Sequence, residues 1–288
     1  MPDFQVGLHV SSAGSLDLAF DRALGVGATT FQMFTRNPNQ WRFNPIPDEV
    51  VQAFRDKRKK AGFKHVVAHM PYLPNLASPQ PTILKASRSS LSAEVKRCDA
   101  LEIDYLVAHL GSHMGRGTVS GVRNVSAAIN ESIARSSEET TILLENMAGQ
   151  KNSVGARFEE LAMILDGVKK SERVAVCLDT CHLYAAGFDL ASEEAVNRTM
   201  ALFDECVGYD RLKTVHLNDS KGALGSNLDR HEHVGKGKIG VEGMKAILHY
   251  KGMADRPLIM ETPFADERAM RQSLAIVRRL LERRLNVK

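Results

Sequence analysis

The sequence predicts an α/β fold of the (β/α)8 TIM-barrel type, made by residues 1–288 as one domain, with functional residues at the C-terminal ends of the strands. Two observations lead to this fold: short apolar runs alternate eight times with segments of helical periodicity, and no linker or low-complexity tract interrupts the series. A doubly wound open sheet is the competing topology, and it usually carries a glycine-rich phosphate turn after its first strand. No such turn follows Val10, which favours the closed barrel.

Eight runs rich in valine, isoleucine, leucine and phenylalanine are expected to form buried parallel strands. In chain order they are Gln5–Val10, Thr29–Phe34, His65–His69, Tyr105–Leu110, Thr141–Glu145, Val174–Asp179, Thr214–Leu217 and Leu258–Glu261. Helical patterns lie between them, the first capped by Ser15 and the second by Asp48. The first of these helices extends from Ser15 to Leu24 and the second from Asp48 through Phe54. The others are expected over Leu84–Ala100, Gly121–Arg135, Phe158–Lys169, Ser192–Val207, Val241–Tyr250 and Asp266–Leu285.

The composition is that of an ordinary globular protein, with 43% hydrophobic and 25% charged residues. A net charge of +4 permits a polyanionic partner without requiring one. The N-terminus has no signal-peptide pattern and no apolar run is long enough to cross a membrane, so we expect a cytoplasmic protein. Four cysteines are too few for a disulfide framework, and Cys177 and Cys181 are expected to be buried thiols.

Residue types that bind metals recur where the predicted strands end. These positions are His9, His69, His109, Glu145, Asp179 with His182, His216 with Asp229 and His231, and Glu261. A single histidine at a strand end is more often a structural residue. A carboxylate that closes an apolar strand such as TILLE must find partners or become neutral. Because the carboxyl ends of barrel strands meet at one rim, several such residues together favour a metal centre with more than one ion.

The segment Lys213–Gly240 continues from a strand into a long glycine-rich loop that carries Asp229 and His231. Alternate positions of an extended chain project to one side, so these two side chains could share one ion; a solvated loop is the alternative. Apart from His9, these positions supply five histidines and four carboxylates, which exceed the ligands of one tetrahedral zinc. The donor set favours Zn²⁺, with Mn²⁺ or Fe²⁺ possible at some sites. The residues alone therefore predict metal-dependent hydrolysis or isomerisation in a barrel.

Three motifs occur in the order LLENMAGQ (143–150), LDTCHLYAAGFD (178–189) and HLNDSKGALGSNLDRHEHVGKGKIG (216–240). Through them the whole chain resembles the endonuclease IV family of apurinic/apyrimidinic (AP) endonucleases, which are TIM barrels with three zinc ions. The resemblance implies one ligand set for each ion. The sets are His69, His109 and Glu145; Glu145, Asp179, His216 and Glu261, with Glu145 bridging; and His182, Asp229 and His231.

The resemblance also implies the reaction, which is hydrolysis of the phosphodiester 5′ to an abasic site in duplex DNA. The products are a 3′-hydroxyl and a 5′-deoxyribose phosphate, and members of the family also trim blocked 3′ ends. Glu145, Glu261 and His182 are the candidate catalytic residues. Water near Glu145 would attack phosphorus, Glu261 would orient that water or accept its proton, and the zinc near His182 would offset charge on the departing oxygen.

The expected partner is duplex DNA with abasic sites or blocked 3′ ends, bound by a monomer at the strand-end loops. Tyr72 and Leu73 in PYLPNLAS resemble the side chains that the family wedges into DNA, although ordinary loop packing is the alternative. In TRNPNQW, Asn39 stands where an intercalating arginine is expected, and Arg36 is the candidate substitute. Candidate phosphate contacts, each of which could also be a solvated surface charge, are Lys221, Arg230, Lys236 and Lys238.

Two other functions compete with this one. A sugar isomerase or epimerase of the xylose-isomerase type also binds divalent metals in a barrel, but it needs two ions and a lysine or glutamate for proton transfer. The pair Asp229-x-His231 is surplus to that chemistry. A non-catalytic module for damaged DNA has no use for an intact ligand set. The sequence therefore favours the endonuclease.

Overall fold

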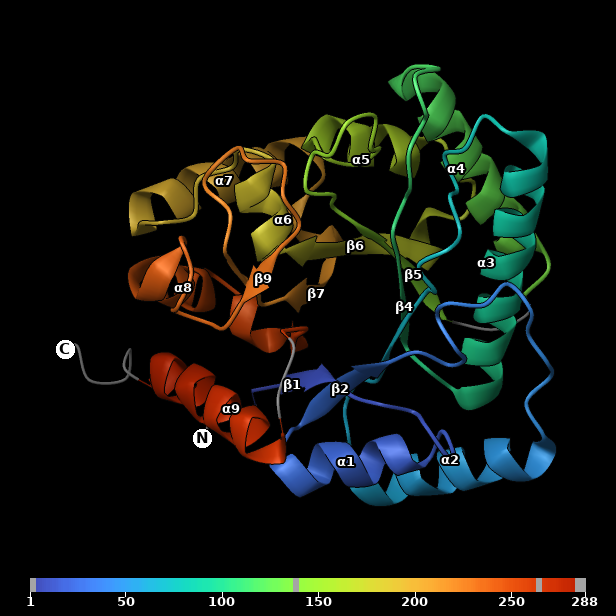
Figure 1. Cartoon of the computed structure of the whole chain (residues 1–288), viewed down its shortest axis with the longest axis horizontal. Coiled ribbons are helices and arrows are strands. Elements are labelled where there is room, and N and C mark those ends of the chain that lie inside the picture. Colours follow the sequence, from blue (N-terminus) through green and yellow to red (C-terminus); the bar gives the residue numbers. More distant parts are fainter. Residues whose placement is uncertain (1–3, 137–139, 263–265, 283–288) are drawn as a thin grey trace.

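The computed structural model describes residues 4–136, 140–262 and 266–282. Its centre is a closed barrel of parallel strands in the order β1-β2-β3-β4-β5-β6-β7-β10, with β10 pairing back to β1 (Figure 1). The strands are β1 (Val6–His9), β2 (Thr30–Met33), β3 (Val67–His69), β4 (Tyr105–Ala108), β5 (Thr141–Glu145), β6 (Val174–Asp179), β7 (Leu212–His216) and β10 (Leu258–Met260). All eight predicted strands are confirmed, and the predicted TIM barrel is the fold.

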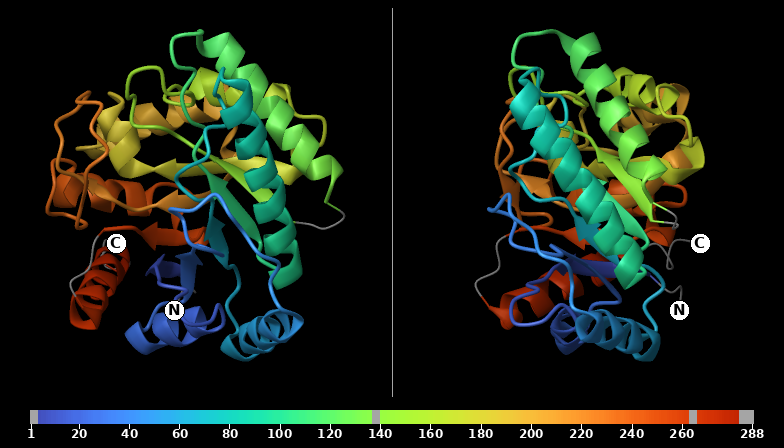
Figure 2. Two further views of the ribbon diagram at one scale, coloured as in Figure 1. Left: turned by 45° about the vertical axis from the view of Figure 1, so that its right-hand side comes forward. Right: turned by 90° about the vertical axis from the view of Figure 1, so that its right-hand side faces the viewer.

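Helices surround the strands, as the two views of Figure 2 show. The main ones are α1 (Leu18–Val26), α2 (Asp48–Ala61), α3 (Pro81–Leu101), α4 (Thr118–Ala134), α5 (Phe158–Asp166), α7 (Glu193–Cys206), α8 (Gly240–His249) and α9 (Glu267–Glu282). Smaller elements join them: α6 (Thr180–Ala185), the 3-10 turns η1 (Ser171–Arg173), η2 (Tyr209–Arg211) and η3 (Met253–Asp255), and a hairpin of β8 (Asp219–Ser220) and β9 (His231–Glu232). None of the helices in the described segments is long and apolar enough to cross a membrane.

The two predicted helix caps are wrong by one or two residues. Asp17, rather than Ser15, is the N-cap of α1, and the Ser15 hydroxyl donates a hydrogen bond to the Asp17 carboxylate. Pro47 is the N-cap of α2, so Asp48 is the first helical residue. Its negative charge still interacts favourably with the unpaired N–H groups of the first turn. Proline fixes φ near the value that helix entry requires, which explains why the helix begins one residue earlier than the capping pattern suggests.

Two hydrophobic layers hold the barrel. The outer layer lies between strands and helices and includes the buried ring of Phe20, whose centroid lies 5.0 Å from that of Phe31 and 4.9 Å from that of Phe54. The inner layer fills the barrel itself with Val67, Val107, Leu143, Ala175 and Cys177, and Tyr105 packs against it. Cys181 is also buried, so both thiols lie where the sequence predicts. The barrel is a packed core, and functional residues are confined to its ends.

Candidate metal centre

All nine candidate ligands lie at the C-terminal end of the barrel. His69, Glu145, Asp179 and His216 are the last residues of β3, β5, β6 and β7. His109 and Glu261 each follow the end of a strand by one residue, β4 and β10 respectively. His182 belongs to α6, and the β7–α8 loop supplies Asp229 and His231. Because parallel strands share one mouth, residues far apart in sequence meet there, and the nine candidates form three groups, beside a further one in which Cys181 lies close to Asp179 and His231.

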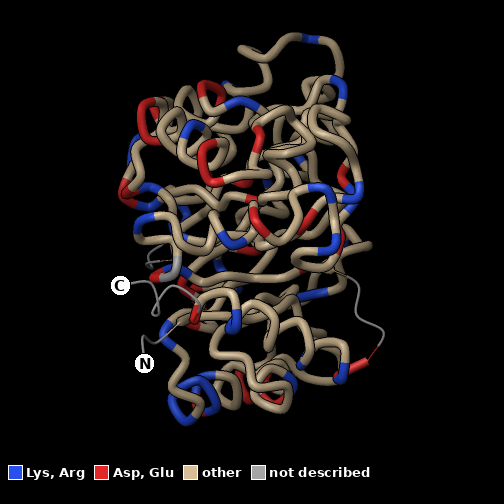
Figure 3. Tube along the Cα trace, turned by 90° about the vertical axis from the view of Figure 1, so that its left-hand side faces the viewer, with Lys and Arg blue, Asp and Glu red and all other residues tan. Residues whose placement is uncertain are grey.

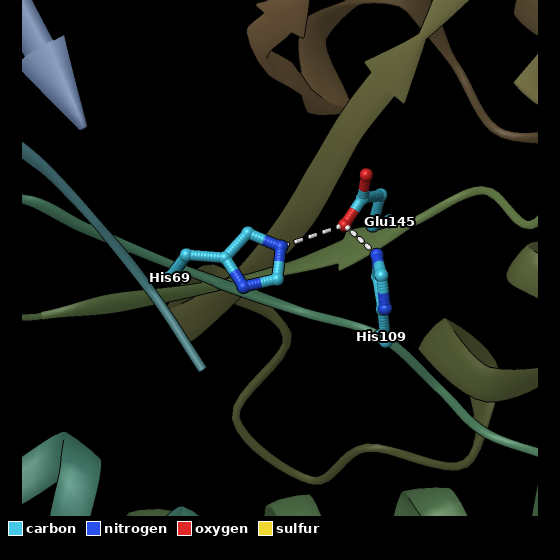
Figure 4. Close-up of side chains that lie close together, drawn as sticks. All are labelled: His69, His109 and Glu145. Carbon is cyan, nitrogen blue, oxygen red and sulfur yellow. Dashed lines mark hydrogen bonds and ion pairs between the residues drawn. The ribbon is translucent and has the colours of Figure 1, made fainter. Parts of the chain in front are cut away.

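The first group consists of His69, His109 and Glu145. In Figure 4, the two imidazoles approach the same carboxylate oxygen from different sides. His69 Nε2 lies 3.1 Å and His109 Nε2 lies 2.9 Å from Glu145 Oε2. Glu145 is fully buried, and two imidazole nitrogens that converge on one carboxylate oxygen are a set of ligand atoms that could hold one cation.

The second group uses the other oxygen of the same carboxylate. Glu145 Oε1 lies 3.0 Å from His216 Nδ1, which is also 3.1 Å from Glu261 Oε2 and 3.9 Å from Asp179 Oδ2. Each oxygen of Glu145 therefore faces a different group. Such a carboxylate could contribute one oxygen to each of two ligand groups.

The third group lies beside the other two and is built largely from the loop. His182 Nε2 is 3.2 Å from Asp229 Oδ2, and His231 Nε2 is 3.3 Å from Asp229 Oδ1. His231 Nε2 also lies 3.5 Å from Asp179 Oδ2, which connects this group to the second. The candidate ligand atoms within each of the three groups lie within 4.8 Å of one another.

The donors and their spacing fit Zn²⁺. Zinc bonds to imidazole nitrogen and carboxylate oxygen are about 2.0–2.2 Å, so neighbouring ligand atoms of a tetrahedral site lie about 3.3 Å apart. The nitrogen-to-oxygen separations of 2.9–3.3 Å in the first and third groups are close to that value. His182 Nε2 and His231 Nε2 are also buried atoms that find no hydrogen-bond partner of suitable geometry among the described residues. A shared cation would satisfy both nitrogens.

The electrostatics of the centre favour cations. Burial lowers the pKa of His182, but the carboxylates of Asp179, Asp229 and Glu145 outweigh burial and raise that pKa to about 10. Burial raises the pKa of Glu145, but the neighbouring imidazoles of His109 and His216 hold it well below its usual range. Glu145 thus stays ionised in a buried site, and the negative potential that raises the pKa of His182 also attracts divalent ions, which compete with the proton on that ring.

Backbone carbonyls orient two of the histidines. His69 Nδ1 donates to the carbonyl oxygen of Met70 at 2.7 Å, and His182 Nδ1 donates to that of Asn146 at 2.9 Å. A carbonyl can only accept, so in both rings Nδ1 carries a hydrogen, and Nε2 is the atom whose lone pair would be available to an ion that displaces its proton. The main chain therefore selects the ligand atom of these two residues.

Two asparagines that the sequence did not single out hold the carboxylates in place. Asn146 Oδ1 accepts from the backbone N–H of Asp179 at 2.7 Å. Asn218 Nδ2 donates to Asp179 Oδ2 at 2.7 Å, and Asn218 Oδ1 accepts from the backbone N–H of Glu261 at 2.8 Å. Asp179 is in turn the N-cap of α6, since its Oδ1 accepts from the backbone N–H of His182 at 2.8 Å. Their positions in the sequence could have identified them, because each asparagine follows a strand-end candidate ligand by one or two residues.

Asp219 fixes the loop that carries the third group. It is fully buried, and its two oxygens accept hydrogen bonds from the backbone N–H groups of Gly237, Ile239 and Gly240 at 2.9, 2.9 and 3.2 Å. The chain passes so close at Gly237 that a Cβ there would lie 2.4 Å from Asp219 Oδ1, which explains the glycine. Through the β8–β9 hairpin, Ser220 pairs with His231. The buried carboxylate thereby sets the position of a candidate ligand.

The candidate DNA contacts fall into two kinds. Tyr72 and Leu73 are exposed (57% and 38%), and the Tyr72 ring centroid lies 6.2 Å from that of His69, beside the centre. Asn39 is exposed as well. On the β7–α8 loop the exposed basic residues are Lys221, Arg230, Lys236 and Lys238. On the side drawn in Figure 3, basic and acidic residues are interspersed and form no continuous basic surface. The loops beside the metal centre therefore remain the candidate binding surface for DNA.

Arg36 does not fit the role of an intercalating residue, and that prediction is wrong. Its Nε lies 2.5 Å from Oε1 of the fully buried Glu94, its Nη2 donates to Ser90 Oγ at 2.7 Å, and its side chain is only 7% exposed. Withdrawing this guanidinium would leave a buried carboxylate without its partner. Arg36 instead anchors the β2–α2 loop to α3.

Comparison with known proteins agrees with the fold and the site. Residues 20–280 match a family model described as a xylose isomerase-like TIM barrel. A protein of Methanoculleus marisnigri named "Probable endonuclease 4" is 47% identical over 96% of this chain and 98% of its own length. The crystal structure of endonuclease IV from Thermus thermophilus is 36% identical, with a TM-score of 0.87 over 97% of this chain and 99% of that one. A D-tagatose 3-epimerase-like protein, 18% identical with a TM-score of 0.70 over 96% and 97% of the two chains, shares the fold alone. The chain belongs to the endonuclease IV family.

Proposed function

We propose that this protein is an AP endonuclease. It hydrolyses the phosphodiester 5′ to an abasic site in duplex DNA, leaves a 3′-hydroxyl and a 5′-deoxyribose phosphate, and also removes blocking groups from 3′ ends. The observation that carries the proposal is the set of three adjacent ligand groups, the first two sharing Glu145 and the third lying beside Asp179, in a chain of the endonuclease IV family. A two-ion sugar isomerase would leave the third group, with Asp229 and His231, without a purpose.

Three zinc ions are the proposed cofactors, one for each group. His69, His109 and Glu145 would hold the first, Glu145, Asp179, His216 and Glu261 the second, and His182, Asp229 and His231 the third. When bound, the ions supply a water of lowered pKa and electrostatic stabilisation of the phosphoryl and departing oxygens. The remaining work of binding and orientation belongs to the side chains of the protein.

Glu261 is the candidate for orienting the attacking water. Gln32 Nε2 donates to its Oε1 at 2.7 Å, so the carboxylate is held in one orientation. Burial raises the pKa of Glu261, but the neighbouring His216 outweighs burial and holds it far below the usual range. Such a carboxylate is a weak proton acceptor at neutral pH, since the pKa of an effective general base lies near the working pH. We therefore assign Glu261 the orientation of water rather than the removal of its proton.

Tyr72 and Leu73 would occupy the space left when the duplex is bent and the damaged nucleotide leaves the stack. This role is supported by the exposure of both side chains and by the position of the Tyr72 ring, whose centroid lies 6.2 Å from that of His69. Lys221, Arg230, Lys236 and Lys238 would contact phosphates from the β7–α8 loop and set the register of the DNA. Asn39, which lacks the charge of an arginine, would add a polar contact at the rim.

The proposal is tested by strand incision. A duplex with one abasic site and the same duplex without it are incubated with the zinc-loaded protein, and the products are sized against markers with defined 3′ ends. We expect a single cut 5′ to the abasic site, no cut in the control, loss of cutting after chelation and recovery on addition of Zn²⁺. A folded, zinc-loaded protein that leaves the abasic duplex intact would refute the function.

The third group can be removed without unfolding the barrel. Asp229→Ala and His231→Ala are each expected to cost one metal equivalent and to leave thermal unfolding of the barrel nearly unchanged, because both residues lie on the partly exposed loop. Metal analysis after gel filtration, with circular dichroism on the same samples, measures both quantities. Unfolding of both variants at room temperature would instead show that the group is structural.

A further inference from the structure

Gln32 is a fully buried polar residue in the mouth of the barrel, on a strand that supplies none of the candidate ligands. The nine ligands come from β3, β4, β5, β6, β7, β10 and the segments that follow them. The β2 sequence TFQM is otherwise apolar apart from Thr30, whose hydroxyl donates to the carbonyl oxygen of His65 at the opposite end. A glutamine has no structural reason to occupy such a position unless its amide is fully hydrogen-bonded.

The amide of Gln32 contacts two ligands of the second group. Its Oε1 lies 2.8 Å from His216 Nε2, and its Nε2 lies 2.7 Å from Glu261 Oε1. The same nitrogen lies 3.1 Å from His9 Nδ1, at the end of the neighbouring strand β1. The Gln32 side chain thus connects His216 and Glu261 with His9 of β1, a strand that supplies none of the candidate ligands.

Hydrogen-bond chemistry fixes the direction of each contact. An ionised carboxylate can only accept, so the amide nitrogen of Gln32 must face Glu261 and its carbonyl oxygen must face His216. His216 Nε2 therefore carries a hydrogen and donates it. The lone pair of Nδ1 is then left for a metal, on the side where Glu145, Asp179 and Glu261 lie.

His216 differs in this respect from the candidate ligands His69 and His182. His69 and His182 are fixed by backbone carbonyls and present Nε2, whereas His216 is fixed by a side chain and presents Nδ1. A substitution at Met70 or Asn146 leaves the backbone carbonyl that accepts from His69 or His182 in place. A substitution at Gln32 removes the side-chain oxygen that accepts from His216. The second group is thus the one whose geometry a single substitution on β2 can change.

We propose that Gln32 is a positioning residue of the metal centre. It holds His216 with Nδ1 directed at the ion, and it holds Oε1 of Glu261 so that Oε2 stays directed at the same ion. The inference rests on the proposed metal centre but not on DNA as the substrate. Partners of this kind, one shell behind the ligands, typically change metal affinity about 10–100-fold when they are removed.

The test compares Gln32→Leu with Gln5→Leu. Gln5 is a matched control, because it is also a buried glutamine of the barrel whose Oε1 accepts a hydrogen bond from a histidine, His65 Nδ1 at 2.8 Å, at the end away from the metal centre. Zinc-loaded samples are exposed to a graded chelator, and retained zinc is counted by mass spectrometry. We expect Gln32→Leu to lose one of its ions about 10–100-fold more readily than wild type and Gln5→Leu to match wild type. Equal retention by all three proteins would overturn the inference.

A spectroscopic measurement tests the same point without any variant. Nitrogen-15 NMR of histidine side chains in the zinc-loaded wild type is expected to show His216 with hydrogen on Nε2 and a metal-shifted Nδ1, the reverse of His69 and His182. The opposite assignment for His216 would overturn the inference even if Gln32→Leu did not fold. A wild type that binds zinc as expected but does not cut abasic DNA would refute the proposed function alone.

Discussion

Glu145→Gln is expected to lower the rate of incision of abasic DNA by roughly 1,000-fold or more, since it weakens two ion sites with one change. Both oxygens of Glu145 are in use, one toward His69 and His109 and the other toward His216. An amide keeps the shape of the side chain but replaces one anionic oxygen with an NH2 group, which cannot bind a cation. The variant should therefore retain fewer zinc ions than wild type.

Single-turnover incision and metal analysis on the same sample measure these two effects together. Glu242→Gln, at an exposed glutamate in the first turn of α8, serves as the control and should behave like wild type. Full zinc content together with wild-type incision in Glu145→Gln would show that the bridging carboxylate is dispensable. Loss of incision at full zinc content would instead assign Glu145 to the chemistry and not to ion retention.

Asp219→Ala should be the most destabilising single substitution considered for the loop, with a loss of about 3–5 kcal/mol in the free energy of unfolding. The substitution leaves the backbone N–H groups of Gly237, Ile239 and Gly240 without their acceptor in a buried place. The loop would then no longer be pinned beside the barrel, and His231 would lose its position opposite Ser220. We therefore expect loss of the third ion as well as lower stability.

Urea unfolding followed by circular dichroism gives the stability change, and metal analysis gives the ion count. Asp189→Ala is a useful control, because that carboxylate accepts one hydrogen bond, from the backbone N–H of Ala191, on a partly buried turn. Its loss should cost no more than about 1 kcal/mol. If Asp219→Ala were as stable as this control, the buried carboxylate would not be what holds the loop.

The sequence predicts the barrel and the ligand groups well for a physical reason. Parallel strands that alternate with helices must bring their carboxyl ends to one mouth, so the strand-end residues His69, Glu145, Asp179 and His216 have to meet. Helix α6 was missed because six residues are too short for a periodic pattern, and its start depends on a cap by Asp179 that is itself a candidate ligand.

Side-chain pairs between distant segments are what the sequence cannot predict. Arg36 is paired with Glu94 on α3, far along the chain, and nothing in TRNPNQW indicates that its guanidinium is already occupied. Gln32 likewise looks like an isolated polar residue in a strand until His216 and Glu261 are seen beside it. Such pairings depend on side-chain directions that only the folded chain defines.

The packed interior of the barrel has a consequence for how ions and substrate would reach the centre. Val67, Val107, Leu143, Ala175 and Cys177 fill the channel below the ligands, and the rings of His65 and Tyr105 stack at 5.2 Å beyond them. Ions and DNA would therefore reach the candidate metal centre from the same end of the barrel, the C-terminal rim that carries Tyr72 and Leu73. A duplex seated on that rim would close the exit, so the substrate itself would keep the ions from escaping for as long as it stays bound.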